Sequence, residues 1–355
     1  MCYNNTDLCR RSFRGRIGKT SFCQNRFHRK GPPLCLGENI AMNKITIIGS
    51  GSVGSTIAYS LALMGLASEI VMIDINREKA LGEALDIRQG TPFCAPCAVY
   101  AGDYRDAKDS NIVILTSGIA RKAGQSRLEL AQINVDITKS IIPEITKYAP
   151  DAVYVIVSNP VDILTYTFHK MSGLPEGHIL GSGTILDTAR LRARLSEYFT
   201  ISQNNVHAYV FGEHGDSAFV PWSVANISNV PIEECGKVFV KRGMIPPTVD
   251  FKEVEAYVRE SGGRVIARKG ATFYAVSMSV CHICKCILSG IDTTMTVSTM
   301  LHGEYGIEDV CLSTLNIVGY DGVHNQVNMS LADDEVAKLQ HSAKILRDVI
   351  DQLKI

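Results

Sequence analysis

A histidine flanked by glycines is the residue whose type and setting in this chain best suit proton transfer. Residues 211–217 read Phe-Gly-Glu-His-Gly-Asp-Ser, which places His214 between two glycines with an acidic residue on either side. Histidine gains and loses its proton near neutral pH, because its ordinary pKa is about 6.5. The small neighbours leave the ring approachable by a substrate. We therefore consider His214 a candidate proton donor.

A second polar cluster, Asp187-Thr-Ala-Arg190, lies 27 residues upstream of His214. Asp187 and Arg190 are three residues apart in a predicted helix, so they share one face of it. One of the two can orient a histidine, while the other can bind a carboxylate through a bidentate pair of hydrogen bonds. An ordinary ion pair on the helix surface is the alternative interpretation of this spacing.

A glycine-rich loop near residue 50 predicts a nucleotide-binding site. Residues 49–54 read Gly-Ser-Gly-Ser-Val-Gly, and this GxGxxG pattern ends a predicted strand and opens a predicted helix. The first glycine allows a tight turn, the second lets the backbone approach a pyrophosphate, and the third lets helix and strand pack closely. The helix N-terminus attracts the negative charge of the pyrophosphate. We expect the cofactor to be held by Gly49, Gly51, Ser52, Val53 and Gly54.

An acidic residue further along indicates which dinucleotide binds. Asp74 lies twenty residues after Gly54, at the end of the second predicted strand. A carboxylate at this place accepts hydrogen bonds from the ribose hydroxyls and repels a 2′-phosphate. The sequence therefore predicts NAD, rather than NADP, as the cofactor.

Two further segments carry polar residues that could contact a ligand. Asn159 precedes a proline at the end of the strand predicted over 153–158, and ligands of doubly wound folds bind at such strand ends. The asparagine is either part of a plain turn or a hydrogen-bonding residue for the nicotinamide or the substrate oxygen. Residues 118–127 form a glycine-bearing loop with Arg121, Lys122 and Arg127. This loop suits closure over an anion or is a solvated charged segment.

The elements that position these residues alternate between strands and helices in the first half of the chain. Apolar strands are predicted at 44–48, 69–74, 112–116 and 153–158, with helices at 53–64, 77–89 and 127–148. Such alternation indicates a parallel sheet covered by helices on both faces. The second half is predicted to hold helices at 187–198, 251–268 and 271–288, short strands before residue 230, a hairpin around 320–322 and a helix over 336–353.

The predicted fold class is therefore α/β, a doubly wound parallel Rossmann sheet followed by an α+β catalytic domain. We expect an NAD-binding domain over 42–182 and a catalytic domain, which binds the substrate, over 183–355. Residues 1–41 hold eight lysines and arginines and two acidic residues and lack apolar periodicity, so we expect a basic extension outside the core. This extension is either an organelle transit segment or the result of a mis-assigned start. We favour Met42 as the start, because a predicted strand begins immediately after it.

Composition excludes several other classes of protein. The chain has 355 residues, of which 46% are hydrophobic and 20% charged, as in ordinary soluble globular proteins. Its net charge is zero, and residues 1–41 carry +6, so the remainder carries −6 and should not attract nucleic acid. We found no run of 18 apolar residues, and therefore expect no membrane span.

The eleven cysteines include two pairs at a spacing that metal sites also use. Cys94 and Cys97 lie in a proline-flanked segment with no second ligand pair following at zinc-finger spacing. Cys281 and Cys284 lie inside an apolar helical run, where thiols usually pack in the core. We expect reduced thiols, a cytoplasmic protein and no metal site.

Taken together, these motifs resemble the L-lactate/malate dehydrogenase family over nearly all of residues 42–355. The resemblance rests on five segments in the family's order, namely 49–54, 117–127, 158–165, 181–190 and 212–217. It implies an NAD-dependent oxidoreductase that acts on a small 2-oxo or 2-hydroxy acid. It also implies a homotetramer, which the residues themselves do not indicate.

The resemblance implies a role for each polar residue of the site. His214 would donate a proton to the substrate's carbonyl oxygen while NADH delivers hydride to the carbonyl carbon. Asp187 would hold His214 in the required tautomer, and Arg190 would bind the substrate's carboxylate. Arg127, carried on a mobile loop, would polarise the carbonyl, and Asn159 would hydrogen-bond the same oxygen. Closure of the loop would expel water, so these charges would act at low dielectric.

Two residues give opposite indications about the substrate. By the resemblance, Arg121 occupies a loop position that faces the substrate's variable end, where lactate enzymes usually carry glutamine and malate enzymes arginine. Thr272, in contrast, matches the threonine that lines the pyruvate methyl pocket, and residues 212–217 resemble lactate enzymes more than malate enzymes. We expect reversible reduction of pyruvate to L-lactate, with oxaloacetate and malate as the alternative pair.

The resemblance also implies a candidate regulatory site. Arg192 and His207 match positions at which bacterial members of the family bind fructose 1,6-bisphosphate between subunits. The alternative is that they are ordinary surface residues.

Two other classes of protein were considered. A catalytically silent NAD-binding protein would be expected to lack the residues of the polar site, which are all present. A sugar or polyol dehydrogenase would need a Tyr-xxx-Lys pair on a helix after the fourth strand. That region offers Tyr166 and His169-Lys170, which we expect to be at the wrong spacing, so we do not favour this class.

Overall fold

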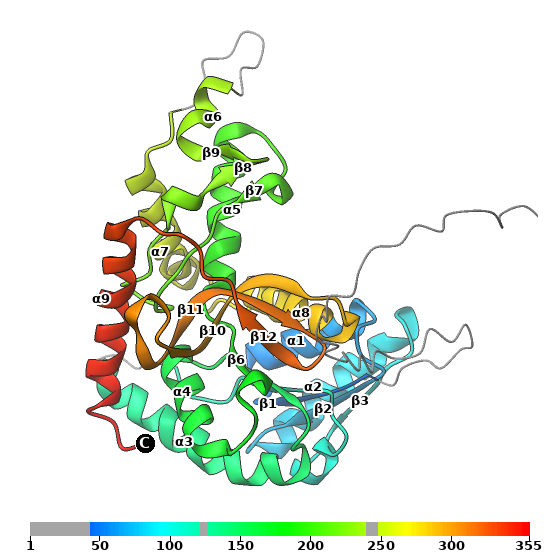
Figure 1. Ribbon diagram of the computed structural model, residues 1–355. Helices are drawn as coiled ribbons and strands as arrows, with labels where there is room; N and C mark the ends of the chain where they lie inside the picture. Colours follow the sequence, from blue (N-terminus) through cyan, green and yellow to red (C-terminus); the bar gives the residue numbers. More distant parts are fainter. Residues whose placement is uncertain (1–42, 121–125, 239–247) are drawn as a thin grey trace, which may run out of the picture. The chain divides into compact units, whose positions relative to one another are not determined.

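Six parallel strands form the first part of a long sheet. The computed structural model describes residues 43–120, 126–238 and 248–355. The parallel strands are β1 (Lys44–Ile48), β2 (Glu69–Ile73), β3 (Ala98–Ala101), β4 (Ile112–Leu115), β5 (Val153–Ile156) and β6 (Ile179–Gly181). The helices that follow or join them are α1 (Ser52–Leu63), α2 (Arg77–Gly90), α3 (Arg127–Tyr148) and α4 (Val161–Ser172) (Figure 1).

The strand order reverses between β1 and β4. This part of the sheet has the order β3-β2-β1-β4-β5-β6, so successive strands are added on one side of β1 and then on the other. In such sheets ligands bind outside the carboxyl ends of the strands, where the order reverses. The predicted doubly wound α/β fold is therefore confirmed. The glycine loop, residues 116–120 and Asn159 all follow these strands at that edge.

Apolar side chains from alternate strand positions pack on opposite faces of the sheet. On one face Ile48 and Val71 belong to a core cluster that includes side chains of α3, α4 and the C-terminal helix α9 (Asp333–Ile350). On the other face Ile45 and Ile47 pack with residues of α1, α2 and α8 (Tyr274–Ser289). Because both faces are covered, the strands consist almost entirely of apolar residues.

The sheet continues with antiparallel strands from the second half of the chain. β10 (Thr293–His302) pairs with β6 through Ser298 and Gly181, and is followed by β11 (Glu308–Gly319) and β12 (Gly322–Gln326). A small separate sheet contains β7 (Val206–His207), β8 (Asn226–Ile227) and β9 (Val230–Pro231). The remaining helices are α5 (Ile185–Phe199), α6 (Ile232–Val238) and α7 (Phe251–Lys269), and a third apolar cluster lies between α5, α6, α7 and this small sheet.

Most predicted elements occur within a few residues of their expected bounds, but five were missed. One of them is α6, which has only seven residues. α4 was missed because its polar residues Asp162, Thr165 and Thr167 are buried along with the apolar ones, so polar side chains do not mark a solvent-facing side of this helix. β10 was missed because three of its hydroxyl residues, Thr296, Ser298 and Thr299, are buried together with apolar residues, which hides the alternation of a half-buried strand. β3 and β6 have four and three residues, too few for a periodic pattern.

The N-terminal extension and the expected absence of a membrane span are the two remaining features predicted from the sequence. The predicted basic extension, residues 1–41, lies outside the described residues. Among the helices that are described, none is both long and apolar enough to cross a membrane.

Candidate active site

A cavity of about 620 Å³ lies at the carboxyl ends of the parallel strands. Its wall is formed by residues that follow β4 and β5, by the first turns of α5, by the segment around His214, and by α7 and α8. Six residues of the predicted site line it, namely Val53, Asn159, Asp187, Arg190, His214 and Thr272. Segments far apart in the sequence are thus brought together at the edge where a ligand was expected.

Pairing with two neighbouring segments positions the loop that carries His214. The backbone of Phe211 exchanges two hydrogen bonds with that of Phe219, at 2.9 and 3.1 Å, and Gly212 pairs in the same way with Ser313. Gly212 has a φ of +95°, a conformation that side-chain-bearing residues rarely adopt. Gly212, two residues before His214, is therefore required by the turn that directs the loop toward the cavity.

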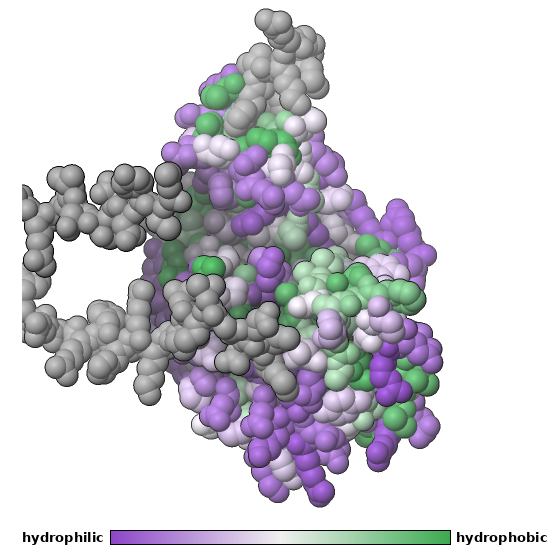
Figure 2. All heavy atoms as spheres, turned by 90° about the vertical axis from the view of Figure 1, so that its right-hand side faces the viewer, coloured by the Kyte–Doolittle hydropathy of each residue, from purple (hydrophilic) through white to green (hydrophobic). Residues whose placement is uncertain are grey.

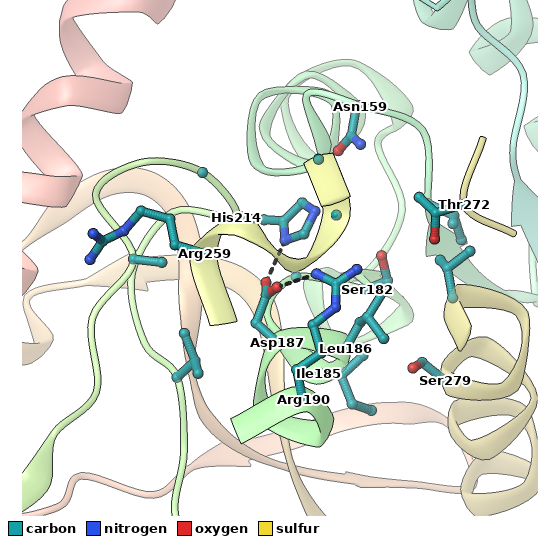
Figure 3. Close-up of a pocket in the computed structure, with 18 of the residues that line it drawn as sticks. Asn159, Ser182, Ile185, Leu186, Asp187, Arg190, His214, Arg259, Thr272 and Ser279 are labelled. Carbon is teal, nitrogen blue, oxygen red and sulfur yellow. Dashed lines mark hydrogen bonds and ion pairs between the residues drawn. The ribbon is translucent and has the colours of Figure 1, made fainter. Parts of the chain in front are cut away.

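His214, Asp187 and Arg190 form a continuous chain of polar contacts in the cavity wall (Figure 3). His214 Nδ1 lies 2.6 Å from Asp187 Oδ2, and Arg190 Nη1 donates to Asp187 Oδ1 at 2.8 Å. Asp187 is only 7% exposed, so its contact with Arg190 is not an ordinary ion pair on a helix surface. Because Nδ1 is bound to Asp187, Nε2 is the ring nitrogen left to exchange a proton with a ligand.

Electrostatics favour the protonated form of His214 in this arrangement. Burial opposes a positive charge on the ring, but the attraction and hydrogen bond of Asp187 outweigh it and raise the pKa of His214 above its ordinary value. Burial likewise opposes the Asp187 carboxylate, and His214 together with Arg190 reverses the effect and lowers the pKa of Asp187. The pair can therefore hold an imidazolium beside a carboxylate, which is the state that a proton donor needs.

Asp162 is a further residue of the site that sequence reasoning did not identify. It lies in the first turn of α4 and is 2% exposed. Its Oδ2 accepts the backbone N–H of His214 at 2.8 Å, and its Oδ1 accepts the hydroxyl of Ser298, in β10, at 2.6 Å. Burial raises the pKa of Asp162 to about 6, although both hydrogen bonds oppose this rise. Its place in the segment Asn-Pro-Val-Asp was the only available signal, because α4 and β10 were not predicted.

The glycine loop has the geometry that a dinucleotide pyrophosphate requires. Gly49 has a φ of +106°, and a Cβ there would lie 2.7 Å from the backbone nitrogen of Ser117. A Cβ on Gly54 would lie 1.9 Å from the carbonyl oxygen of Gly49, whereas one on Gly51 would meet nothing within 4 Å. The N-terminus of α1 has neither a side-chain cap nor an acidic residue in its first turn. The loop thus fits an anion in front of Gly51 and the N–H groups of the helix.

Asp74 connects the end of β2 to the glycine loop. Its two carboxylate oxygens accept backbone N–H groups, from Ser50 at 2.6 Å and from Asn76 at 2.8 Å. The carboxylate retains free lone pairs in this arrangement, because each oxygen can accept more than one hydrogen bond. The geometry is consistent with the predicted ribose contact.

Asn159 is positioned by a second asparagine, Asn134 of α3. Asn134 Nδ2 donates to the carbonyl oxygens of Asn159 at 2.8 Å and of Ile119 at 3.2 Å, while its Oδ1 accepts the Ile119 N–H at 2.9 Å. Asn134 is 2% exposed. One buried side chain therefore holds the segment after β4 next to the segment after β5, on the cavity side of the sheet.

Of the two arginines predicted to act from the loop, Arg121 and Arg127, the structure describes only Arg127. Arg121 lies outside the described residues, so the structure does not describe its surroundings. Arg127 is the first residue of α3, and its Nη2 lies 2.7 Å from Oδ2 of Asp216, with both side chains largely exposed. Asp216 lines the cavity two residues after His214, but Arg127 does not line it. Arg127 is therefore next to the loop that carries His214 rather than among the residues around the cavity.

The predicted regulatory pair lies away from the cavity. The Arg192 Nε donates to the carbonyl oxygen of Ala208 at 3.1 Å, and the guanidinium also lies over the ring of Tyr209. Burial lowers the pKa of Arg192. His207 is exposed in β7, directly before Ala208. Arg192 thus packs against the segment that carries His207.

The expectation that Tyr166 and Lys170 are at the wrong spacing was wrong, because the two residues are four apart, as in a Tyr-xxx-Lys pair. In the structure the Tyr166 hydroxyl donates to Asp309 at 3.2 Å, and Lys170 forms an ion pair with the same carboxylate. Neither residue lines the cavity. Their position therefore argues against that class of enzyme.

Two family models match consecutive parts of the chain. The model for the lactate/malate dehydrogenase NAD binding domain matches residues 43–181. The model for the alpha/beta C-terminal domain of the same family matches residues 184–354. The NAD cofactor predicted from Gly49–Gly54 and Asp74 is thereby confirmed.

Individual relatives agree with these matches. The L-lactate dehydrogenase of Thermoanaerobacterium saccharolyticum is 47% identical over 314 residues, which cover 88% of this chain and 100% of the relative. That of Acetivibrio thermocellus is 42% identical over 324 residues, covering 90% of this chain and 100% of the relative. The solved structure of the minor L-lactate dehydrogenase from Enterococcus mundtii superposes with a TM-score of 0.83 at 37% identity, over 88% of this chain and 99% of that one.

Proposed function

The chain belongs to the lactate/malate dehydrogenase family of NAD-dependent oxidoreductases, and from this membership we propose that it catalyses the reversible reduction of pyruvate to L-lactate. One observation carries the proposal, which is the chain of contacts from His214 through Asp187 to Arg190 in the cavity wall. This chain of contacts places a proton donor, His214, close to a cation that can bind a carboxylate, Arg190. Relatives named L-lactate dehydrogenase add support.

His214 acts as the proton donor in this proposal. Its Nε2 gives a proton to the substrate's carbonyl oxygen, which becomes the hydroxyl of lactate, and takes it back in the reverse direction. Asp187 binds Nδ1 and stabilises the positive charge of the protonated ring. The raised pKa of His214 supports this role, because it extends to higher pH the range in which the ring carries the proton that it donates.

Arg190 binds the carboxylate of the substrate, and other cavity residues orient the rest of the molecule. The guanidinium of Arg190 has donors beyond the one that Asp187 uses, and a planar fork matches a carboxylate. Asn159 hydrogen-bonds the substrate's carbonyl oxygen, and Thr272 contacts its methyl group. Support for both assignments comes from their places in the cavity lining.

Arg127 polarises the carbonyl in the same proposal, which requires it to exchange partners. Its guanidinium is paired with Asp216, and both side chains are about 70% exposed. An exposed ion pair of this kind is weak, so the guanidinium can leave Asp216 for a substrate oxygen at little energetic cost.

The cofactor is held at the glycine loop. Gly49–Gly54 and the N-terminus of α1 bind the pyrophosphate, and Asp74 binds the ribose next to it. When bound, NADH supplies the hydride that reduces the substrate's carbonyl carbon. The NAD-binding domain would extend over 42–182 and the catalytic domain over 183–355.

Oxaloacetate is the second candidate substrate, because of one residue. An arginine at position 121 would pair with the second carboxylate of a dicarboxylic acid, as its loop position in malate enzymes implies. Thr272 and the sequence of residues 212–217 favour pyruvate instead, and we propose pyruvate for that reason.

Steady-state kinetics with pyruvate and oxaloacetate test the proposal. We expect a higher kcat/KM for pyruvate, and a His214→Asn variant that loses roughly 10²- to 10⁴-fold in kcat, as general acids do when removed. The variant should still bind NADH, measured by fluorescence titration. His341→Asn, at an exposed position in α9, is the matched control and should keep full activity. A kcat/KM that favours oxaloacetate a hundredfold would overturn the choice of pyruvate.

The proposal also covers how the subunits assemble and how the enzyme is regulated. We propose a cytoplasmic homotetramer in which Arg192 and His207 of neighbouring subunits bind fructose 1,6-bisphosphate. Exposed apolar residues support an association, because Tyr59 and Leu63 of α1 and Tyr274 and Met278 of α8 are all more than half exposed. Figure 2 shows hydrophobic side chains gathered on the side of the molecule where these two helices lie. Such patches often mark contacts between proteins.

A further inference from the structure

One face of α7 lines the cavity along three helical turns. The residues concerned follow the i, i+3, i+4 spacing of a single helix face, and they are Glu255, Val258, Arg259, Gly262, Gly263 and Ile266. The middle of this stripe consists of two consecutive glycines. The side chains on either side of them are larger, so the stripe is hollowed at its centre.

Neither glycine is required by the backbone. α7 is an unbroken helix over Phe251–Lys269, and neither Gly262 nor Gly263 has a positive φ. Glycine is among the least favourable residues in a helix interior, because it loses the most conformational freedom on folding. Two of them in succession therefore destabilise α7 without any gain in backbone geometry.

Packing against protein atoms does not require these glycines either. A Cβ on Gly262 would lie 3.7 and 3.9 Å from the two terminal nitrogens of Arg190, which is ordinary van der Waals contact. A Cβ on Gly263 would meet nothing within 4 Å among the described residues. Alanine would fit at both positions, so what the glycines keep open is space inside the cavity rather than room for a neighbouring side chain.

This space adjoins the place of the substrate's side chain. In the proposed function Arg190 binds the carboxylate of a 2-oxo acid, and the side chain of such an acid starts two bonds from the carboxylate carbon. Two side chains that flank the glycines on this face, those of Val258 and Ile266, are aliphatic, and Val276 of α8 lines the same cavity. The charges of Arg259 and Glu255, whose nearest atoms are 3.9 Å apart, offset each other.

We propose that Gly262 and Gly263 are specificity-determining residues that let this enzyme reduce 2-oxo acids whose aliphatic side chain is larger than a methyl group. The inference rests on the proposed function, because it takes Arg190 as the carboxylate site. The chemical class is that of monocarboxylic 2-oxo acids with straight or branched side chains, in addition to pyruvate. The predicted methyl contact of Thr272 then forms only part of the side-chain pocket.

Kinetics on a series of substrates test this inference. The series contains pyruvate, 2-oxobutanoate and 2-oxo-4-methylpentanoate, each with saturating NADH, and we expect the wild-type kcat/KM of the longest acid to be within about tenfold of that of pyruvate. In Gly262→Ala and Gly263→Ala we expect the ratio of the longest acid to pyruvate to fall about tenfold or more, the effect that one methyl group has in a substrate pocket. The double variant should show the larger fall.

Gly82→Ala is the matched control. Gly82 is in the interior of α2, away from the cavity, and a Cβ there also meets nothing within 4 Å. All three single variants should raise Tm, because alanine replaces glycine inside a helix, but Gly82→Ala should leave the substrate ratio unchanged. NADH titration checks that every variant is folded and binds the cofactor.

The outcomes separate this inference from the proposed function. An enzyme that reduces pyruvate but is about a thousandfold poorer with both longer acids contradicts the inference alone, since the single methylene added in 2-oxobutanoate would then cost more than one methylene ordinarily does in a substrate pocket. The same holds if the alanine variants leave the substrate ratio unchanged. An enzyme inactive on every monocarboxylic 2-oxo acid contradicts the proposed function, and this inference with it.

Discussion

His214 contacts two carboxylates, one through its ring and the other through its backbone. Asp187 binds Nδ1 and sets the tautomer, whereas Asp162 accepts the N–H of the histidine's own peptide. Both carboxylates raise the pKa of His214, whereas the positive charge of Arg190 lowers it. Asp162 is thus a positioning residue in the proposed reaction, because it acts on the histidine rather than on the substrate.

We predict that Asp162→Asn moves the pH profile of pyruvate reduction. Reduction needs a protonated His214, so kcat/KM falls as pH rises through the pKa of this histidine. Loss of the negative charge should lower that pKa and move the alkaline limb to lower pH by on the order of one pH unit. The asparagine can still accept the backbone N–H through its oxygen and donate to Ser298.

Ser298→Ala is the control for this substitution. It removes one hydrogen bond of Asp162 but keeps the negative charge, so its alkaline limb should move less than that of Asp162→Asn. A uniform loss of rate at every pH, with the limb in place, would mean that Asp162 is only structural.

At the scale of the element, α4 is a helix whose first eight residues are all buried. His169 follows them, and its two ring nitrogens are buried as well. Burial lowers the pKa of His169 to about 4, and the nearby Lys170 and His302 act in the same direction, while Glu176 opposes them. The folded protein therefore holds this histidine neutral at pH values where the unfolded chain protonates it.

We predict that this histidine makes the protein sensitive to acid. Between pH 6.5 and 4 the unfolded chain binds a proton at position 169 that the folded chain does not, so the free energy of unfolding falls as pH falls through this window. The expected loss between pH 7 and pH 5 is about 2 kcal/mol from this group. His169→Leu should remove that part of the loss, as measured by urea unfolding at both pH values. Equal losses in wild type and variant would contradict the assignment.

At the scale of the whole molecule, the proposed regulation depends on assembly. Arg192 is bound through Nε to the backbone of Ala208, and His207 is exposed next to it. One subunit offers a single basic pair, whereas two subunits related by a twofold axis would offer two pairs to the two phosphates of one effector.

We predict that fructose 1,6-bisphosphate lowers KM for pyruvate by about fivefold or more, the lower range of ordinary allosteric coupling. His207→Gln should reduce this effect, and inorganic phosphate at the same concentration should not reproduce it. Sedimentation velocity with and without the effector reports the assembly state. A KM that does not change with the sugar bisphosphate would count against the regulatory site.

Local patterns were enough to predict much of the site and the fold. The GxGxxG loop, Asp74 and the strand–helix alternation predicted the doubly wound fold and NAD, because glycine turns and apolar periodicity depend on neighbouring residues. Asp187 and Arg190 could be paired from their spacing alone, since residues three apart share one face of a helix. The family resemblance then supplied the role of each polar residue.

Only the tertiary structure decided which distant residues meet these motifs. Asp162 and His214 are 52 residues apart, Ser298 is 136 residues from Asp162, and Gly262 borders Arg190 across a different pair of helices. No local pattern encodes such contacts, because they arise from the packing of α4, β10 and α7 around the cavity. The sequence by itself therefore predicted which polar residues could carry out the chemistry, because their types and local spacing are encoded nearby. The packing of distant elements decided the surroundings of the histidine and the shape of the cavity.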